Sequence, residues 1–177
     1  MTPMAKVQEE SKTVKAILRE LQQEAATTRR VLERVPADKL SWKPQPKSMS
    51  LGQLANHIAM IPGNLSKLAQ VDEFDASSAN FTPPTPKDVQ EVLATLDAGV
   101  AAAREYVGGL TEAALDGTWK MSAGGKQILA MSRQEFLRSI MLNHWYHHRG
   151  QMSVYLRLLD VPVPSIYGPS ADENPFA

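Results

Sequence analysis

The chain of 177 residues contains no cysteine, and this absence removes several kinds of site at once. Disulfide scaffolds, thiolate metal ligands and a protein thiol nucleophile are all excluded. Any metal site must therefore use nitrogen and oxygen ligands. Any thiol chemistry must use a thiol supplied from outside the chain.

The chain also lacks an excess of charge and a long apolar run. Its 19 basic residues balance 19 acidic residues, so it has no electrostatic footprint for nucleic acid or for an anionic membrane surface. No apolar run reaches the length of a membrane span. Lys6, Glu9 and Glu10 stand where a signal peptide would need its apolar core. We therefore expect a cytoplasmic protein with no nucleic-acid or membrane partner, folded as one domain over residues 1–177.

Four amphipathic segments carry apolar residues at helical spacing. They lie at about residues 5–35, 50–70, 86–107 and 132–160. The second and fourth begin with capping boxes, Ser50-x-x-Gln53 and Ser132-x-x-Glu135. Thr85 is the predicted N-cap of the third, and Pro62 with Gly63 should kink or loosen the second.

The connections between these segments are long. Residues 71–85 form a polar loop, whereas 118–129 have the pattern of a small β-hairpin with a glycine turn at 122–125. An isolated hairpin is marginal, so this one must pack on the helices. The sequence predicts an all-α protein, a four-helix bundle with a small β-hairpin before the last helix.

Histidines gather in the last helical segment, which holds three of the four in the chain. His144 and His148 are one turn apart on the apolar face, whereas His147 lies roughly 80° from the centre of that face. The remaining histidine, His57, lies on the apolar face of the second segment with Leu54 and Ile61. We therefore expect three imidazoles to point into the bundle from two helices.

One inward histidine alone is usually a hydrogen-bonded core residue. Three are harder to explain in this way, because each buried imidazole needs partners of its own. We predict that His57, His144 and His148 bind a divalent metal. Three nitrogen ligands leave a coordination position open, as in catalytic sites. Imidazole suits zinc, nickel, iron and copper alike, so the sequence does not identify the metal.

Other polar residues near the histidines are candidates for supporting roles. Gln151 could hold a ligand imidazole by a hydrogen bond. We expect Arg149 to form a salt bridge or a cap at the rim, and His147 to be partly exposed and not a ligand. Arg149 and Tyr167 are also candidates for the mouth of the site, where they would hold the polar end of a small thiol.

Three stretches, at residues 50–57, 143–151 and 161–173, together resemble the DinB/YfiT-like family, and the resemblance covers essentially the whole chain. The resemblance implies an up-down-down-up four-helix bundle, a homodimer, and zinc or nickel as the metal. It places the ligand roles on His57, His144 and His148. Some relatives are thiol-dependent transferases or isomerases that use bacillithiol, mycothiol or glutathione.

Two functions from different classes remain open. In the first, the protein is a metal-dependent enzyme, a thiol S-transferase, isomerase or hydrolase, whose site activates a thiol or water against a small-molecule substrate. In the second, it is a non-catalytic binding or stress-response protein that a metal stabilises. An open metal site beside a cavity would favour the enzyme, and a fourth protein ligand would favour the structural role.

Overall fold

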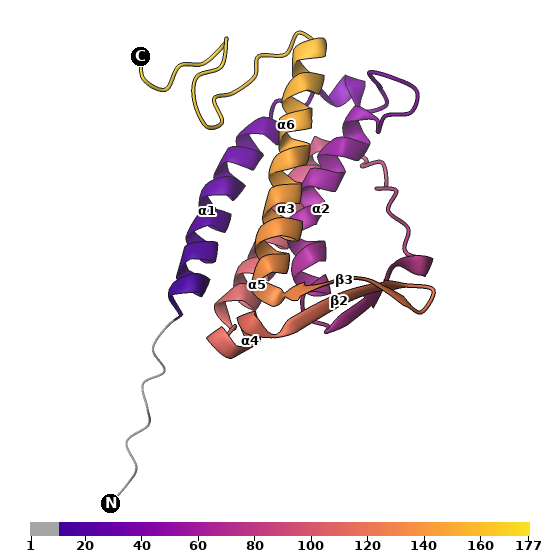
Figure 1. Cartoon of the computed structure of the whole chain (residues 1–177). Coiled ribbons are helices and arrows are strands. Elements are labelled where there is room, and N and C mark those ends of the chain that lie inside the picture. The colour runs from indigo at the N-terminus through magenta and orange to yellow at the C-terminus, as the bar shows by residue number, and fades with distance from the viewer. Residues whose placement is uncertain (1–10) are drawn as a thin grey trace, which may run out of the picture.

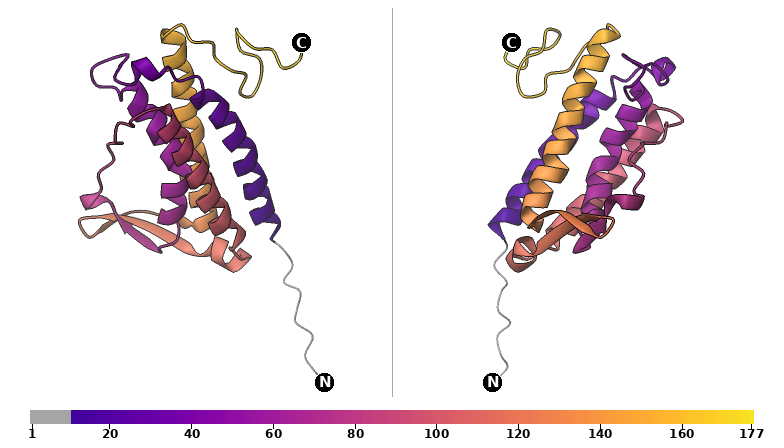
Figure 2. Two further views of the ribbon diagram at one scale, coloured as in Figure 1. Left: turned by 180° about the vertical axis from the view of Figure 1, so that it is seen from behind. Right: turned by 45° about the vertical axis from the view of Figure 1, so that its right-hand side comes forward.

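A computed structural model describes residues 11–177 as a bundle of four long helices with a small sheet at one end (Figure 1). The bundle consists of α1 (Lys12–Leu32), α2 (Leu51–Leu68), α3 (Val89–Gly108) and α6 (Asn143–Leu158). Helices α1 and α6 run in one direction and α2 and α3 in the other, which is the up-down-down-up order implied by the resemblance (Figures 1 and 2). The part of the first predicted helix before residue 11 lies outside the described residues.

Side-chain caps set most of the helix starts. The capping boxes predicted at Ser50 and Ser132 are both present. The prediction for the third helix was wrong, because α3 begins after Asp88 and not after Thr85. The Asp88 carboxylate accepts a hydrogen bond from the backbone N–H of Glu91 at 2.8 Å, and the proline-rich residues before it have no regular structure.

The last predicted helix is divided into three parts. It begins as α5 (Arg133–Glu135), continues as a π-helical stretch, η3 (Phe136–Leu142), and ends as α6. A single α-helix was predicted, so the π-helical stretch is a correction. Such stretches frequently accompany functional sites, and this one ends two residues before His144.

The small sheet has three strands in the order β1–β2–β3. The predicted hairpin is confirmed as β2 (Thr118–Ala123) and β3 (Lys126–Ser132), and its turn places Gly124 and Gly125 at positive φ. Strand β1 (Glu73–Asp75) pairs in parallel with β2, inside the segment predicted as a polar loop. Shorter elements are α4 (Glu112–Asp116), which was not predicted, and the 3₁₀ turns η1 (Ala37–Lys39) and η2 (Ala76–Ser78).

Helices α2 and α3 come close together at a pair of glycines, Gly63 and Gly99. A Cβ added to Gly63 would lie 2.9 Å from the Cα of Gly99, so no larger residue fits without separating the helices. Pro62 lies inside α2, which continues to Leu68. Within residues 11–177, no helix combines the length and the apolar character needed to cross a membrane.

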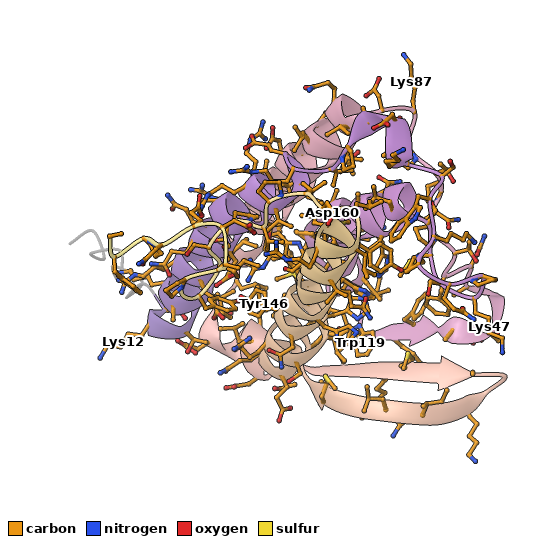
Figure 3. All side chains as sticks on the ribbon, turned by 90° about the horizontal axis from the view of Figure 1, so that it is seen from above. Lys12, Lys47, Lys87, Trp119, Tyr146 and Asp160 are labelled. Carbon is orange, nitrogen blue, oxygen red and sulfur yellow. The ribbon has the colours of Figure 1, made fainter. Side chains whose placement is uncertain are left out.

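Seen from above, α6 lies between α1 on one side and the sheet on the other (Figure 3). Tyr146 points from α6 toward α1, whereas Trp119 lies on the side of the sheet. The Tyr146 hydroxyl donates to the carboxylate of Glu20 on α1 at 2.9 Å, and the Trp119 indole donates to the backbone carbonyl of Leu68 at 3.2 Å.

Candidate metal centre

Three histidine side chains from α2 and α6 meet inside the bundle. His57, His144 and His148 each offer a ring nitrogen within 4.8 Å of the other two, and no carboxylate of residues 11–177 joins this group. The three ring planes are inclined to one another by 74° to 87°. Rings in this arrangement can each direct one nitrogen toward a shared point, so the structure brings together the three residues that the sequence singled out.

The separation of the nitrogens fits a shared ligand. The Nε2 atoms of His57 and His144 are 3.1 Å apart. Two nitrogens at that separation can both lie about 2.1 Å from one cation, the usual distance for zinc. Without a cation, the same separation is a hydrogen bond in which one ring carries the proton that the other accepts. A metal would replace that proton.

Burial keeps these imidazoles neutral. Desolvation, followed by the nearby His144, lowers the pKa of His57 to about 4. Desolvation also lowers the pKa of His148 to about 4, although the hydrogen bond with Gln151 opposes the shift. The pKa of His144 is lowered by burial and by the charge of His147. Since only the neutral imidazole binds a metal, the site has its ligands in the binding form at neutral pH.

Gln151 holds the ring of His148. Its side-chain oxygen lies 2.7 Å from His148 Nδ1, which makes that nitrogen the donor and leaves Nε2 free to face the cluster. This is the contact expected of a residue that orients a metal ligand. His147 is exposed while His148 is buried, so the two adjacent histidines face different ways, as the helical phase predicts.

A cavity of about 460 Å³ opens beside the cluster. His57 and His144 form part of its wall, and the rest comes from α2, the sheet, the segment 79–84 and η3. Most of the lining is apolar, including Met60, Phe74, Trp119, Met121, Phe136 and Ile140. The π-helical stretch thus contributes Phe136 and Ile140 to the same cavity that His144 enters.

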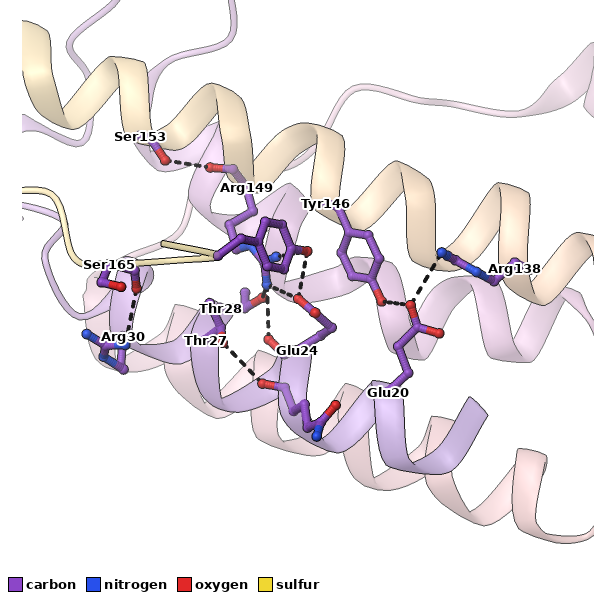
Figure 4. A network of polar contacts seen from close by, with 12 residues as sticks. Glu20, Glu24, Thr27, Thr28, Arg30, Arg138, Tyr146, Arg149, Ser153 and Ser165 are labelled. Carbon is purple, nitrogen blue, oxygen red and sulfur yellow. Dashed lines mark hydrogen bonds and ion pairs between the residues drawn. The ribbon is translucent and has the colours of Figure 1, made fainter. Parts of the chain in front are cut away.

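Arg149 and Tyr167 do not line this cavity. Arg149 lies on the other side of α6, where its side chain is 1% exposed and forms an ion pair of 2.6 Å with Glu24 of α1 (Figure 4). It also donates to the hydroxyls of Thr28 and Tyr167, and lies over the ring of Tyr146 at 5.2 Å. The salt bridge expected for Arg149 is present, but it is buried between α1 and α6 and not at a rim. The geometry therefore does not support the expectation that Arg149 and Tyr167 lie at the mouth of the site and hold the polar end of a thiol.

Sequence reasoning did not identify the residue that holds segment 79–84 against the cavity. Asn56 is buried, and its side-chain amide donates to the backbone carbonyl of Pro84 at 3.0 Å. This bond fixes the proline-rich segment beside α2, one residue away from His57. A polar residue on a buried helix face next to a ligand histidine was the signal that could have indicated it.

Known proteins that are similar to this chain support the assignment of the fold. The chain is 27% identical over 163 residues to the uncharacterized protein YrdA of Bacillus subtilis, covering 91% of this chain and 92% of YrdA. A DinB-like protein of Bacillus cereus superposes with a TM-score of 0.65 at 23% identity, covering 86% of this chain and 97% of its own. The DinB-like protein YjoA of Bacillus subtilis superposes with a TM-score of 0.62 at 19% identity, covering 89% of this chain and 98% of YjoA. The model of the DinB family matches residues 9–175, and the chain belongs to the DinB family.

Proposed function

We propose that His57, His144 and His148 bind one divalent metal, zinc or nickel, and that the protein is a metal-dependent enzyme that joins a small thiol to an electrophile. The observation that carries this proposal is the convergence of three neutral imidazoles, two of which, His57 and His144, lie in the wall of an apolar cavity. A site built only to stabilise the bundle has no need of a cavity beside it. The proposal includes thiol S-transferase and isomerase reactions, and a hydrolase if water takes the place of the thiol.

The ligand set supports an open site. No fourth histidine or carboxylate within the described part of the chain approaches the three nitrogens. Three protein ligands with a free position are typical of catalytic metal centres, whereas structural centres are closed by a fourth. When bound there, a divalent cation would lower the pKa of a coordinated thiol or water and so supply a nucleophile at neutral pH.

The residues of the chain position the reactants. Gln151 fixes the ring of His148, which is buried and, with His144, joins the cluster to α6. The apolar wall of the cavity excludes water from an electrophile bound beside His57 and His144. In a transfer reaction the thiol gives its proton to solvent water, its sulfur bonds to the electrophilic carbon, and the leaving group departs with the electron pair of the broken bond.

A binding role without catalysis is the second candidate, and one observation favours it. The three histidines join α2 to α6, so a metal held by them would link two helices of the bundle and stabilise it. In that role the metal raises the melting temperature, but no thiol or electrophile is consumed.

The experiment that separates the two functions uses the purified, metal-loaded chain. It is incubated with bacillithiol, mycothiol or glutathione and a panel of small electrophiles, and product formation is followed by mass spectrometry. The enzyme proposal predicts a thiol conjugate or an isomerised product, abolished by His148→Ala and retained by His147→Ala. Metal-dependent stabilisation with no turnover of any pair would favour the binding role.

We also propose a homodimer, as the resemblance implies. Val154 and Leu158 lie one turn apart on α6 and are each 57% exposed, which supplies an apolar strip for a second copy. Light scattering coupled to size exclusion should give twice the chain mass, and Val154→Glu should reduce it to that of one chain. A wild-type protein of one-chain mass at micromolar concentration would refute the dimer.

A further inference from the structure

The cavity beside the histidines has no ionised side chain in its lining. Among its described lining residues there is no Asp, Glu, Lys or Arg. The polar members of the lining are two asparagine amides, a threonine and the two histidines. Apart from a cation held by the histidines, a charged group brought into this space would lose its hydration and find no opposite charge in the lining, which disfavours binding strongly.

One neutral polar group stands at the far end of the cavity wall. Asn64 lies seven residues after His57 on α2, which places it on the same helix face and about 10 Å along the axis. Its side chain lines the cavity, is exposed, and makes no hydrogen bond to any of residues 11–177. An amide in this state can donate to and accept from a ligand that reaches it.

The segment 79–84, which forms one wall of the cavity, presents apolar surface that a ligand would cover. Phe81 lines the cavity and is nevertheless 72% exposed. The segment that carries it is fixed at its far end, where Asn56 and Gln53 donate to the carbonyls of Pro84 and Pro83. An exposed aromatic ring at the edge of an apolar cavity is typical of a ligand site.

We propose that this cavity binds an uncharged, largely apolar small molecule, which enters with its reacting atom at His57 and His144 and its neutral hydrogen-bonding group at Asn64. The position of the reacting end rests on the proposed function, whereas the neutral, apolar character of the ligand rests on the cavity itself. The molecule is the electrophile of the reaction. The charged or sugar-bearing end of a small thiol does not fit here and must lie outside the cavity.

A pair of probes of equal shape tests the choice of ligand. 4-Phenylbutanamide and 4-phenylbutanoate differ in one terminal group, a neutral amide against a carboxylate. Their binding to the full chain is measured by isothermal titration calorimetry at pH 8, after removal of metal, so that the carboxylate cannot coordinate a cation. We expect the amide to bind at least tenfold more tightly. Equal or tighter binding of the carboxylate, or no binding of the amide at millimolar concentration, would overturn the proposal.

Matched variants test the location. Asn64→Lys adds a cation at the cavity wall and should remove or reverse the preference for the amide. Gln22→Lys adds the same charge on the exposed face of α1 and should leave the preference unchanged. Phe81→Ser should weaken binding of the amide, whereas Phe176→Ser, at a similarly exposed phenylalanine outside the cavity, should not. If both members of each pair behave alike, the probe binds elsewhere and the proposal fails.

Failure of this inference can be told apart from failure of the proposed metal site. A chain that binds the amide but takes up no zinc supports the apolar ligand and refutes the metal-dependent reaction. A chain that binds zinc but not the amide overturns the apolar ligand and leaves the metal site in place.

Discussion

Replacement of Gln151 by leucine should weaken metal binding without removing any ligand. The Gln151 side-chain oxygen accepts a hydrogen bond of 2.7 Å from His148 Nδ1, which fixes both the ring orientation and the nitrogen that faces the cluster. Leucine has a similar size and cannot accept that bond. The His148 ring would then be free to turn, and part of its population would present the wrong nitrogen.

The magnitude follows from the exposure of the residue. Loss of a residue that orients a metal ligand usually lowers metal affinity about 10- to 100-fold. Gln151 is exposed, so water can take over part of its acceptor role. We therefore expect the lower end of the range, about tenfold, which corresponds to ~1.4 kcal/mol.

The assay is a competition titration of the metal-free protein with zinc and a chromophoric chelator at pH 7.5. Gln151→Glu is the matched control, because a carboxylate accepts the same hydrogen bond and should retain at least the wild-type affinity. Zinc affinity of Gln151→Leu within twofold of wild type would refute the reasoning. So would a Gln151→Glu variant weaker than Gln151→Leu.

Three further predictions concern stability. The pKa values of His57 and His148 are lowered to about 4 in the folded protein, so below pH 6.5 the unfolded chain binds protons that the folded chain does not. In urea titrations the metal-free protein should therefore lose stability from pH 6.5 down to about 4, and His57→Gln should lose it less steeply. Equal slopes of stability against pH in the two proteins would contradict this. Chelation should lower the melting temperature of wild type and of His147→Ala but not of His148→Ala, and identical behaviour of the two variants would remove the distinction between them. Gly63→Ala should destabilise the fold, because overpacking against the backbone of α3 costs about 1–3 kcal/mol and exceeds the gain in helix propensity. Gly150→Ala should stabilise the fold by up to ~1 kcal/mol, because no atom lies within 4 Å of the added Cβ. Urea denaturation of both variants tests these opposite changes in the free energy of unfolding.

Local sequence signals predicted the parts of the fold that depend on neighbouring residues. The capping boxes at Ser50 and Ser132 were correct because each is closed within four residues. The glycine turn of the hairpin was correct for the same reason. The facing of His148 inward and His147 outward followed from helical phase together with the apolar face of the same helix, both of which depend on nearby residues.

Features that depend on distant partners could not be predicted. Strand β1 has three residues, too few for a periodic pattern, and it exists because Phe74 pairs with Met121 of β2. Arg149 looked like a rim residue because its partner, Glu24, lies on another helix far away in the sequence. The cavity was also invisible, since it forms where α2, the sheet and η3 meet.

The π-helical stretch has no clear signal in the sequence. Residues 136–142 are as apolar and as helix-compatible as those of an ordinary α-helix, and the capping box at Ser132 starts either form equally well. What distinguishes the stretch is its position, with Phe136 and Ile140 in the cavity wall.

The central claim is that the three histidines bind one metal together. Its most direct test is the zinc and nickel content of the purified protein after dialysis, measured by inductively coupled plasma mass spectrometry and compared with a variant in which His57, His144 and His148 are all replaced by glutamine. The account predicts about one equivalent of zinc or nickel per chain in the wild type and none in the variant, with both proteins folded by circular dichroism. A wild-type chain that retains no zinc or nickel, or a variant that retains as much as the wild type, would contradict it.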